Sequence, residues 1–314
     1  MDIIRYSATY FKEWNNFVAH SKNGTFLSDR RYMDYHSDRF HDHSLMFFDG
    51  DDLLAVLPAN ECDGVLWSHQ GLTYGGLLMN ERCTTQRVLT IFEELCHYLS
   101  KRSIHHVVYK AIPHIYHRLP SEEDLYALTT VCKARLVHRD ISSALCPSSP
   151  VRWRRDRHYG ANKARTDGIT VELSNDFTTF WRILTDNLQQ TYGVNPVHSL
   201  KEIELLKSHF PDAIQLYLAR KSDGSAIGGT VLYVTPKVVH AQYISATAEG
   251  KHLHAVDALY ERIIRHDYVD YPYIDFGKST EGDGTELNES LIYQKEGFGA
   301  RAVCYDWWEW SVTR

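Results

Sequence analysis

Hydrophobic residues recur along this chain at two spacings, which divide it into helix-like and strand-like stretches. Apolar positions three and four residues apart, as in 88–99, predict amphipathic helices. Two short apolar runs around Asp49-Gly50-Asp51-Asp52 predict a β-hairpin. The same signals predict further helices at 10–19, 121–131, 177–188, 199–210 and 256–264. They predict further strands at 107–109, 136–145, 169–173, 214–218, 227–234, 238–244, 273–276 and 302–310.

The order of these elements is the same in both halves of the chain. Each half contains a strand, two helices, a hairpin and then alternating strands and helices, although the two halves share no obvious sequence identity. A chain of 314 residues is long enough for two domains, and Cys146-Pro-Ser-Ser-Pro150 has the composition of a linker. We therefore expect an α+β fold of two tandem units, 1–147 and 148–314, each a mixed, mostly antiparallel sheet flanked by helices.

Composition narrows the class of protein. The sequence is 43% hydrophobic and 24% charged, has no apolar run near the ~18 residues of a membrane span, and begins without a signal-peptide pattern. Its six cysteines are scattered without a C-x-x-C motif, which predicts free thiols in the cytoplasm. A net charge of -6 argues against a broad nucleic-acid-binding surface but allows a local basic patch.

Eighteen histidines raise the question of a metal site. The pairs at 41/43, 105/106 and 252/254 lack the i, i+4 spacing of a helical zinc motif, and no carboxylate completes a ligand set. We therefore expect no metal.

Charged residues gather in one stretch near the C-terminus. The predicted strand at 273–276 carries a carboxylate, Asp275, and leads into a Gly-rich loop and a helix that ends near Lys295. Charged and polar groups at the end of a strand commonly build a ligand site. The candidates that follow Asp275 are Lys278, Ser279, Glu281, Asp283 and Lys295.

Several motifs together resemble a known family. They are Arg154/Arg157 with Lys163-Ala164 before a Gly-Ile-Thr-Val strand, Pro196-Val-His198, Ile274-Asp-Phe-Gly277, Lys295-Glu-Gly-Phe-Gly299, and Ser68-His-Gln-Gly-Leu-Thr-Tyr-Gly-Gly76 in the first half. With the element order, they resemble the FemAB-like proteins, which consist of two GNAT acyltransferase units in tandem. The resemblance implies an N-acyltransferase that uses acyl-CoA or aminoacyl-tRNA as donor. It also implies an acceptor among nucleotide-linked amino sugars or other precursors of the cell envelope and surface polysaccharides.

Acyl transfer to an amine needs a base and charge stabilisation but no covalent nucleophile, and the chain has no G-x-S-x-G motif. Asp275, Glu281 and His69 are the candidates for the base. The alternatives are a loop-capping or ion-paired role for Asp275, a solvated acid for Glu281 and a packed turn for His69. The resemblance implies a substrate contact for Lys295, which could also be an ordinary charge at a helix C-terminus.

Further residues are candidates for substrate binding. Tyr74 would line the acceptor pocket, and the segments Ser68–Gly76 and Tyr273–Gly299 would face one cleft. Strand alternation places His240 and Gln242 on one face, toward the cleft, and Tyr243 on the other. Arg154 and Arg157 could hold phosphate, although a solvated helix face is an equal alternative, and Lys278 is a further candidate for substrate binding.

The donor is the least determined part of the reaction. Acetyl-CoA-dependent GNAT enzymes usually carry Q/R-x-x-G-x-G/A before the helix that binds the pyrophosphate. Here Thr247–His254 retains only Gly250 of that pattern. Acyl-CoA, such as acetyl-CoA, remains the favoured donor with tRNA as the alternative. A GNAT-like module that binds without catalysing a reaction also stays open.

Overall fold

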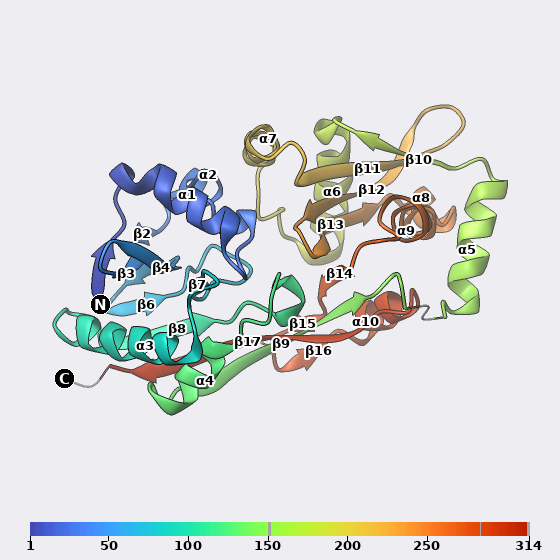
Figure 1. Cartoon of the computed structure of the whole chain (residues 1–314). Helices are drawn as coiled ribbons and strands as arrows, with labels where there is room; N and C mark the ends of the chain where they lie inside the picture. The colour runs from blue at the N-terminus through green and yellow to red at the C-terminus, as the bar shows by residue number, and fades with distance from the viewer. Residues whose placement is uncertain (150–151, 283, 313–314) are drawn as a thin grey trace. The chain divides into compact units, whose positions relative to one another are not determined.

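The computed structural model describes residues 1–149, 152–282 and 284–312 (Figure 1). It divides into two compact units, one formed by Met1–Ile141, Gly282–Glu286 and Cys304–Arg314, the other by Ser142–Glu281 and Leu287–Val303. The expected α+β class with mixed, mostly antiparallel sheets is confirmed. Of the predicted linker, Pro150 lies outside the described residues.

The first unit contains two sets of paired strands and two longer helices. One sheet has the order β1-β3-β4-β7, formed by Asp2–Arg5, Leu45–Asp49, Asp52–Leu57 and Leu78–Met79. The predicted hairpin is the antiparallel pair β3–β4. The other strands are β2 (His41–Asp42), β5 (Asn60–Cys62), β6 (Val65–Trp67), β8 (His106–Lys110), residues 135–141 of β9 (Arg135–Leu145) and the end of β17 (Arg301–Ser311). The helices include α1 (Phe11–His20), α2 (Arg30–Met33), α3 (Thr85–Ser100) and α4 (Glu123–Thr130).

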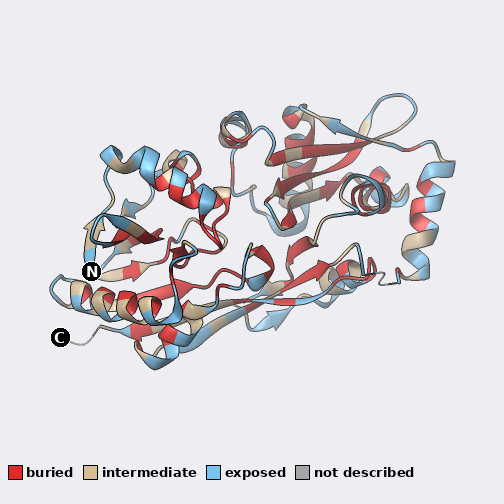
Figure 2. Cartoon of the chain, viewed as in Figure 1, coloured by how far each residue is buried: buried red, intermediate tan, exposed pale blue. Residues whose placement is uncertain are grey.

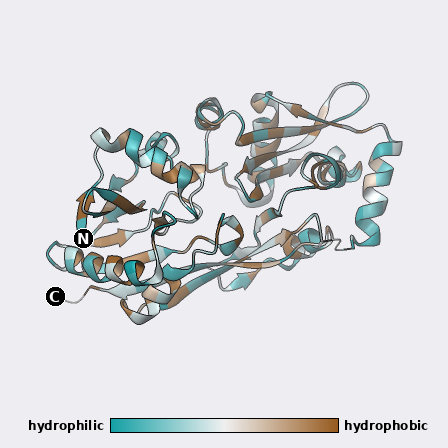
Figure 3. Ribbon diagram, in the orientation of Figure 1, coloured by the Kyte–Doolittle hydropathy of each residue, from teal (hydrophilic) through white to brown (hydrophobic). Residues whose placement is uncertain are grey.

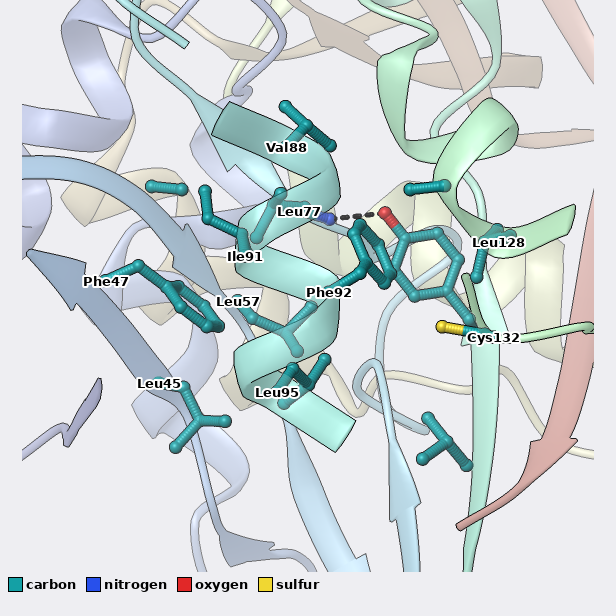
Figure 4. Close-up of a cluster of buried hydrophobic side chains, with 14 of the residues drawn as sticks. Leu45, Phe47, Leu57, Leu77, Val88, Ile91, Phe92, Leu95, Leu128 and Cys132 are labelled. Carbon is teal, nitrogen blue, oxygen red and sulfur yellow. Dashed lines mark hydrogen bonds between the residues drawn. The ribbon is translucent and has the colours of Figure 1, made fainter. Parts of the chain in front are cut away.

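The core of the first unit forms around the apolar face of α3. Figure 4 shows Val88, Ile91, Phe92 and Leu95 of this helix packed with residues from β3, β4 and α4. Each fully buried side chain of this size stabilises the fold by about 1.5–3 kcal/mol. The Tyr109 hydroxyl accepts a hydrogen bond from the backbone N–H of Leu77 at 2.7 Å, so its polar end is also satisfied.

The second unit is a single sheet with helices on both faces. Its strand order is β10-β11-β12-β13-β14, followed by residues 142–145 of β9 (Arg135–Leu145). The strands are Thr170–Ser174, Ile214–Arg220, Ala226–Val234, Val238–Ala246 and Tyr273–Lys278. The helices are α5 (Arg155–Thr166), α6 (Phe177–Tyr192), α7 (Leu200–His209), α8 (Ala248–His252), α9 (Ala255–Arg262) and α10 (Glu289–Glu296), with a π-helical turn at Ile263–Asp267.

Neighbouring strands in this sheet are antiparallel except β13 and β14, which are parallel. One face packs on α9 through a cluster that includes Val239, Ala241 and Ile274. The other face meets α6, where the Oγ of Ser245 donates to the carbonyl of Ile183 at 3.3 Å. Figure 2 shows the central strands buried, and Figure 3 shows the hydrophilic surface of α5.

The capping residues around α7 adopt the predicted structure. Ser199 and Glu202 form a complete capping box, in which each side chain accepts from the other's backbone N–H. Gly193 ends α6 in the left-handed conformation, at φ 68°. These two caps fix the length of the loop between α6 and α7, which carries His198.

Candidate active site

The centre of the second unit's sheet brings a histidine beside a buried aspartate. β13 and β14 pair in parallel at Val238↔Tyr273, Val239↔Ile274 and His240↔Asp275. The last of these pairs sets the two side chains next to each other, and His240 Nδ1 lies 2.9 Å from Asp275 Oδ2. The residues that precede Asp275 in its strand are apolar, and their packing in the core fixes the position of the carboxylate.

Asp275 is fully buried and accepts hydrogen bonds on both oxygens. Oδ1 accepts from the Ser142 hydroxyl and from the Gly277 N–H, the latter at 3.1 Å, while Oδ2 contacts His240. Because no surface of Asp275 is exposed, it cannot contact a substrate directly in this conformation, contrary to the direct form of its predicted role. It can instead orient His240, since a carboxylate requires the proton on Nδ1 and leaves the lone pair on Nε2.

The loop after β14 is held by Lys295. Its ammonium donates to the carbonyls of Gly277 at 2.8 Å and Lys278 at 2.6 Å and to the Ser279 hydroxyl at 2.9 Å. Burial lowers the pKa of Lys295 to about 8, and the negative charge of Asp275 partly opposes this shift. Lys295 therefore fixes the backbone beside Asp275, and its implied contact with substrate stays a prediction.

The remaining polar residues of this loop lie at its surface. Glu281 is exposed and accepts a 2.5 Å hydrogen bond from the side chain of Asn288, the N-cap residue of α10. Lys278 is half-buried and contributes its carbonyl to the bonds around Lys295. Asp283 lies outside the described residues. Catalytic or binding roles for Glu281 and Lys278 stay predictions.

A β-bulge in β13 changes the predicted orientation of its side chains. Ala241 pairs with Leu232 and Tyr243 pairs with Val231, so Gln242 is an extra residue in the ladder. Strict alternation would separate Tyr243 from His240, but the bulge puts both on the face opposite Ala241. The prediction that Tyr243 takes the other face is therefore wrong. Gln242 does share the face of His240, and its side chain hydrogen-bonds to Tyr243.

Arg154 and Arg157 are both engaged inside the second unit. Arg154 pairs with Asp156 at 3.0 Å, and its guanidinium carbon lies 3.4 Å from the ring centroid of Tyr293. Arg157 donates to the carboxylate of Asp257 at 2.8 Å. Since each arginine already has an anionic partner, a phosphate would have to compete with a carboxylate of the protein.

The N-terminus of α9 is the place where a pyrophosphate would sit in a CoA-dependent GNAT unit. Here Asp257, in the first turn of α9, is buried and contacts His254 Nδ1 at 3.1 Å as well as Arg157. Helix α5 closes over it, because a Cβ on Gly160 would stand 2.1 Å from Asp257 Oδ2. An ion pair of the protein, Arg157 with Asp257, thus lies in the first turn of the helix, near the place where a pyrophosphate would bind.

The first-unit motif Ser68–Gly76 is a closely packed turn. The ammonium of Lys110 donates to the carbonyls of His69 at 3.2 Å, Gln70 at 3.0 Å and Leu72 at 2.8 Å. Lys110 is not among the predicted site residues, although a charged residue at the end of an apolar strand is a recognisable signal.

Two side chains of this motif were predicted to take part in the site. Burial lowers the pKa of His69 to about 3, so His69 is too weakly basic for the predicted role of a base near neutral pH. Tyr74 is buried, and its hydroxyl lies 3.1 Å from the Oγ1 of Thr25. Both residues fit the packed-turn alternative better than an open pocket. The predicted meeting of Ser68–Gly76 and Tyr273–Gly299 at one cleft stays a prediction.

Other kinds of site find no support among the described residues. No group of three or more histidine, cysteine, aspartate or glutamate side chains there could hold a metal ion. Over the same ranges, no helix is long and apolar enough to cross a membrane.

Comparisons with known proteins show which domain and which folds this chain resembles. Residues 152–284 match the family described as an acetyltransferase (GNAT) domain. FemX superposes with a TM-score of 0.68 at 10% identity, covering 98% of this chain and 97% of FemX. L-PGS from Bacillus licheniformis superposes with a TM-score of 0.61 at 11% identity, covering 99% of this chain and 93% of L-PGS.

A tandem GNAT protein from the clavulanic acid biosynthesis pathway superposes with a TM-score of 0.53 at 10% identity, covering 100% of this chain and 99% of the other. A search among curated proteins finds no match. At such low identities the superpositions show the fold alone. Residues 152–284 therefore match a GNAT acetyltransferase domain, and the chain shares the fold of FemX and of a tandem GNAT protein.

Proposed function

We propose that this chain transfers an acyl group to the amino group of a cell-envelope precursor or a nucleotide-activated amino sugar, with His240 as the base. The observation that carries this proposal is the contact between His240 and the fully buried Asp275, located inside the matched GNAT domain. A histidine oriented in this way can act as a general base.

The reaction needs no covalent intermediate on the protein. The neutral amine nitrogen bonds to the acyl carbon, and His240 Nε2 takes one proton from that nitrogen. The tetrahedral intermediate collapses with loss of the alcohol or thiol of the donor. Asp275 stabilises the imidazolium that forms, while the Ser142 hydroxyl and the Gly277 N–H hold the carboxylate in place.

The side chains at the N-terminus of α9 affect which acyl donor can bind. Asp257 stands where a CoA pyrophosphate would need the helix N-terminus, which favours aminoacyl-tRNA over the acyl-CoA that the sequence favoured. Exposed basic residues suited to RNA phosphates lie on α5 and on the π-helical turn. They are Arg155, Arg165 and Arg265.

The acceptor class rests on the FemAB-like resemblance and on the likeness to FemX. Such acceptors carry an amino group on a sugar or peptide attached to a nucleotide diphosphate. We place the reaction in the cytoplasm, where both classes of donor and nucleotide-linked precursors are available.

The test is an acyl-transfer assay with defined donors. The purified protein is incubated with acetyl-CoA or with total aminoacyl-tRNA, and with a panel of nucleotide-linked amino sugars and peptidoglycan precursors. Mass spectrometry should detect an acylated acceptor with the tRNA donor. His240→Gln should abolish the product, whereas His97→Gln, an exposed residue of α3, should not.

Two results would contradict the proposal. Product formation at the wild-type rate by His240→Gln would remove the assigned base. Efficient transfer from acetyl-CoA, with saturation at micromolar CoA, would show that Asp257 does not exclude that donor.

A further inference from the structure

Two of the six cysteines, which lie far apart in the sequence, meet in the first unit. Cys96 lies on α3 and Cys132 just after α4, and their Sγ atoms are 3.8 Å apart. Cys132 belongs to the hydrophobic cluster around α3 (Figure 4), and Cys96 packs against that cluster. Cys62, Cys83 and Cys146 each contact an oxygen atom instead. A short movement would bring the sulfur atoms of Cys96 and Cys132 to the distance of a disulfide, about 2.05 Å.

The turn 131–134, between α4 and β9, can supply this movement. Within it, the Cys132 N–H donates to the carbonyl of Ala127 at a long 3.3 Å. The next residue, Lys133, is exposed and has a left-handed backbone with φ 53°. A short exposed turn opens locally more easily than a packed helix. We therefore expect Cys132 to move toward Cys96, which is held in the packed helix α3.

Both thiols can be reached by a small oxidant. Cys96 is only half-buried, and Cys132 lines a cavity of about 390 Å³ together with Lys133, Arg135 and other residues. The contact with Cys132 lowers the pKa of Cys96, although burial opposes this shift. Because the thiolate is the form of cysteine that attacks an oxidant, Cys96 should react first. Cys132 is then next to the oxidised sulfur.

We propose that Cys96 and Cys132 are a redox modification site, at which hydrogen peroxide converts the two thiols into a reversible disulfide. This site lies in the first unit and is independent of the acyl-transfer chemistry proposed above. Its substrate is the peroxide, and a small dithiol can restore the two thiols by exchange.

The oxidation takes place in two steps. The Cys96 thiolate attacks one oxygen of hydrogen peroxide, the O–O bond breaks, and the leaving hydroxide takes up the proton that the Cys96 thiol released. The Cys132 thiolate then attacks the sulfur of the resulting sulfenic acid. The S–O bond breaks, and the second hydroxide takes up the proton of the Cys132 thiol. In sum, two thiols and one peroxide give one disulfide and two water molecules.

The disulfide should change both chemistry and stability. With Cys132 so close, the sulfenic acid of Cys96 is trapped as a disulfide before a second peroxide can oxidise it irreversibly. The bond also joins α3 to the turn before β9 across 36 residues of sequence, which restricts the unfolded chain. The oxidised protein should therefore unfold at a higher temperature than the reduced protein.

The test treats the full-length reduced protein with hydrogen peroxide and then blocks the remaining thiols with N-ethylmaleimide after unfolding. Mass spectrometry of a digest made without reductant should detect a peptide pair that joins Cys96 to Cys132 and has lost two hydrogen atoms. Dithiothreitol should separate the pair. Cys132→Ser should leave Cys96 as a sulfenic acid that dimedone labels. Cys62→Ser, at an exposed cysteine, is the matched control and should keep the cross-link.

We expect peroxide to raise the unfolding midpoint of the wild type and of Cys62→Ser by about 4 °C or more, and to leave that of Cys132→Ser unchanged. Two results obtained on the wild type would overturn the inference, whatever the variants do. The first is that both thiols still react with N-ethylmaleimide after peroxide treatment. The second is that Cys96 or Cys132 is cross-linked mainly to another cysteine. Neither result would affect the role proposed for His240.

Discussion

Replacing Asp275 by asparagine tests the proposed base while keeping the size and shape of the buried side chain. Oδ1 of Asp275 accepts both the Ser142 hydroxyl and the Gly277 N–H, whereas Oδ2 contacts His240 Nδ1. The amide oxygen of the introduced asparagine can keep the first two bonds. Its NH2 group then faces His240 and donates to Nδ1, which forces the ring proton onto Nε2. Asp275→Asn should thus leave His240 in place but unable to accept a proton.

The expected effects on rate and stability differ in size. Loss of a general base lowers the rate by about 10²- to 10⁴-fold, which corresponds to about 3–5 kcal/mol of transition-state stabilisation. Because these three hydrogen bonds survive in altered form, the free energy of unfolding should change by no more than about 1 kcal/mol. Single-turnover acyl transfer measures the first effect, urea unfolding measures the second, and the ¹⁵N shifts of the His240 ring report its tautomer.

A matched control separates this effect from the cost of any buried change. Asp124 is also buried and accepts a hydrogen bond from the Tyr109 hydroxyl in the core of the first unit, so Asp124→Asn should retain the wild-type rate. The reasoning would be refuted if Asp275→Asn were active within about threefold of the wild type. It would also be refuted if His240 kept its proton on Nδ1 in the variant.

Three further predictions concern the free energy of unfolding. The pKa of Lys295 is lowered from 10.5 to about 8 in the folded state, so the folded protein binds fewer protons and stability should rise with pH between these values. Urea unfolding should show the wild type gaining about 2 kcal/mol relative to Lys295→Met between pH 7 and 9.5, and a pH-independent difference would contradict this. Gly250→Ala should lower the free energy of unfolding by about 3 kcal/mol in the same assay, because its Cβ would stand 2.0 Å from the carbonyl oxygen of Ile227. An unchanged unfolding midpoint would show that the backbone moves to accept the Cβ. Ser199→Ala should cost about 1 kcal/mol through its lost cap to Glu202, with Ser199→Asn as the retained-cap control.

The sequence anticipated the elements better than the side-chain geometry. The spacing of hydrophobic residues and the turn residues predicted the hairpin β3–β4, the helices α3 and α6 and the strand that carries Asp275. These depend on neighbours within a few residues, which the sequence displays directly. Capping at Ser199 was predictable for the same reason, since both partners lie three residues apart.

The bulge at Gln242 could not be predicted from the periodicity of hydrophobic and polar residues. Strand alternation assumes that every residue has a partner, and one unpaired residue reverses the face of all those that follow. The face of Tyr243 was therefore predicted wrongly, and its contact with His198, 45 residues away, had no signal in the local pattern. His69 illustrates a second limit, because its low pKa comes from burial in a fold that the motif alone does not define.

The sequence by itself determined which residue types were available and on which elements they lie: a carboxylate at the end of an apolar strand, a lysine near the end of a helix and a motif that resembles FemAB-like proteins. Only the tertiary structure decided that Ser142 meets Asp275 across 133 residues, that Asp257 pairs with Arg157, and that His240 lies against the fully buried Asp275. The physical reason is that burial and long-range hydrogen bonds set protonation and orientation. Both depend on which distant segments pack together, and the local pattern of residues leaves that open.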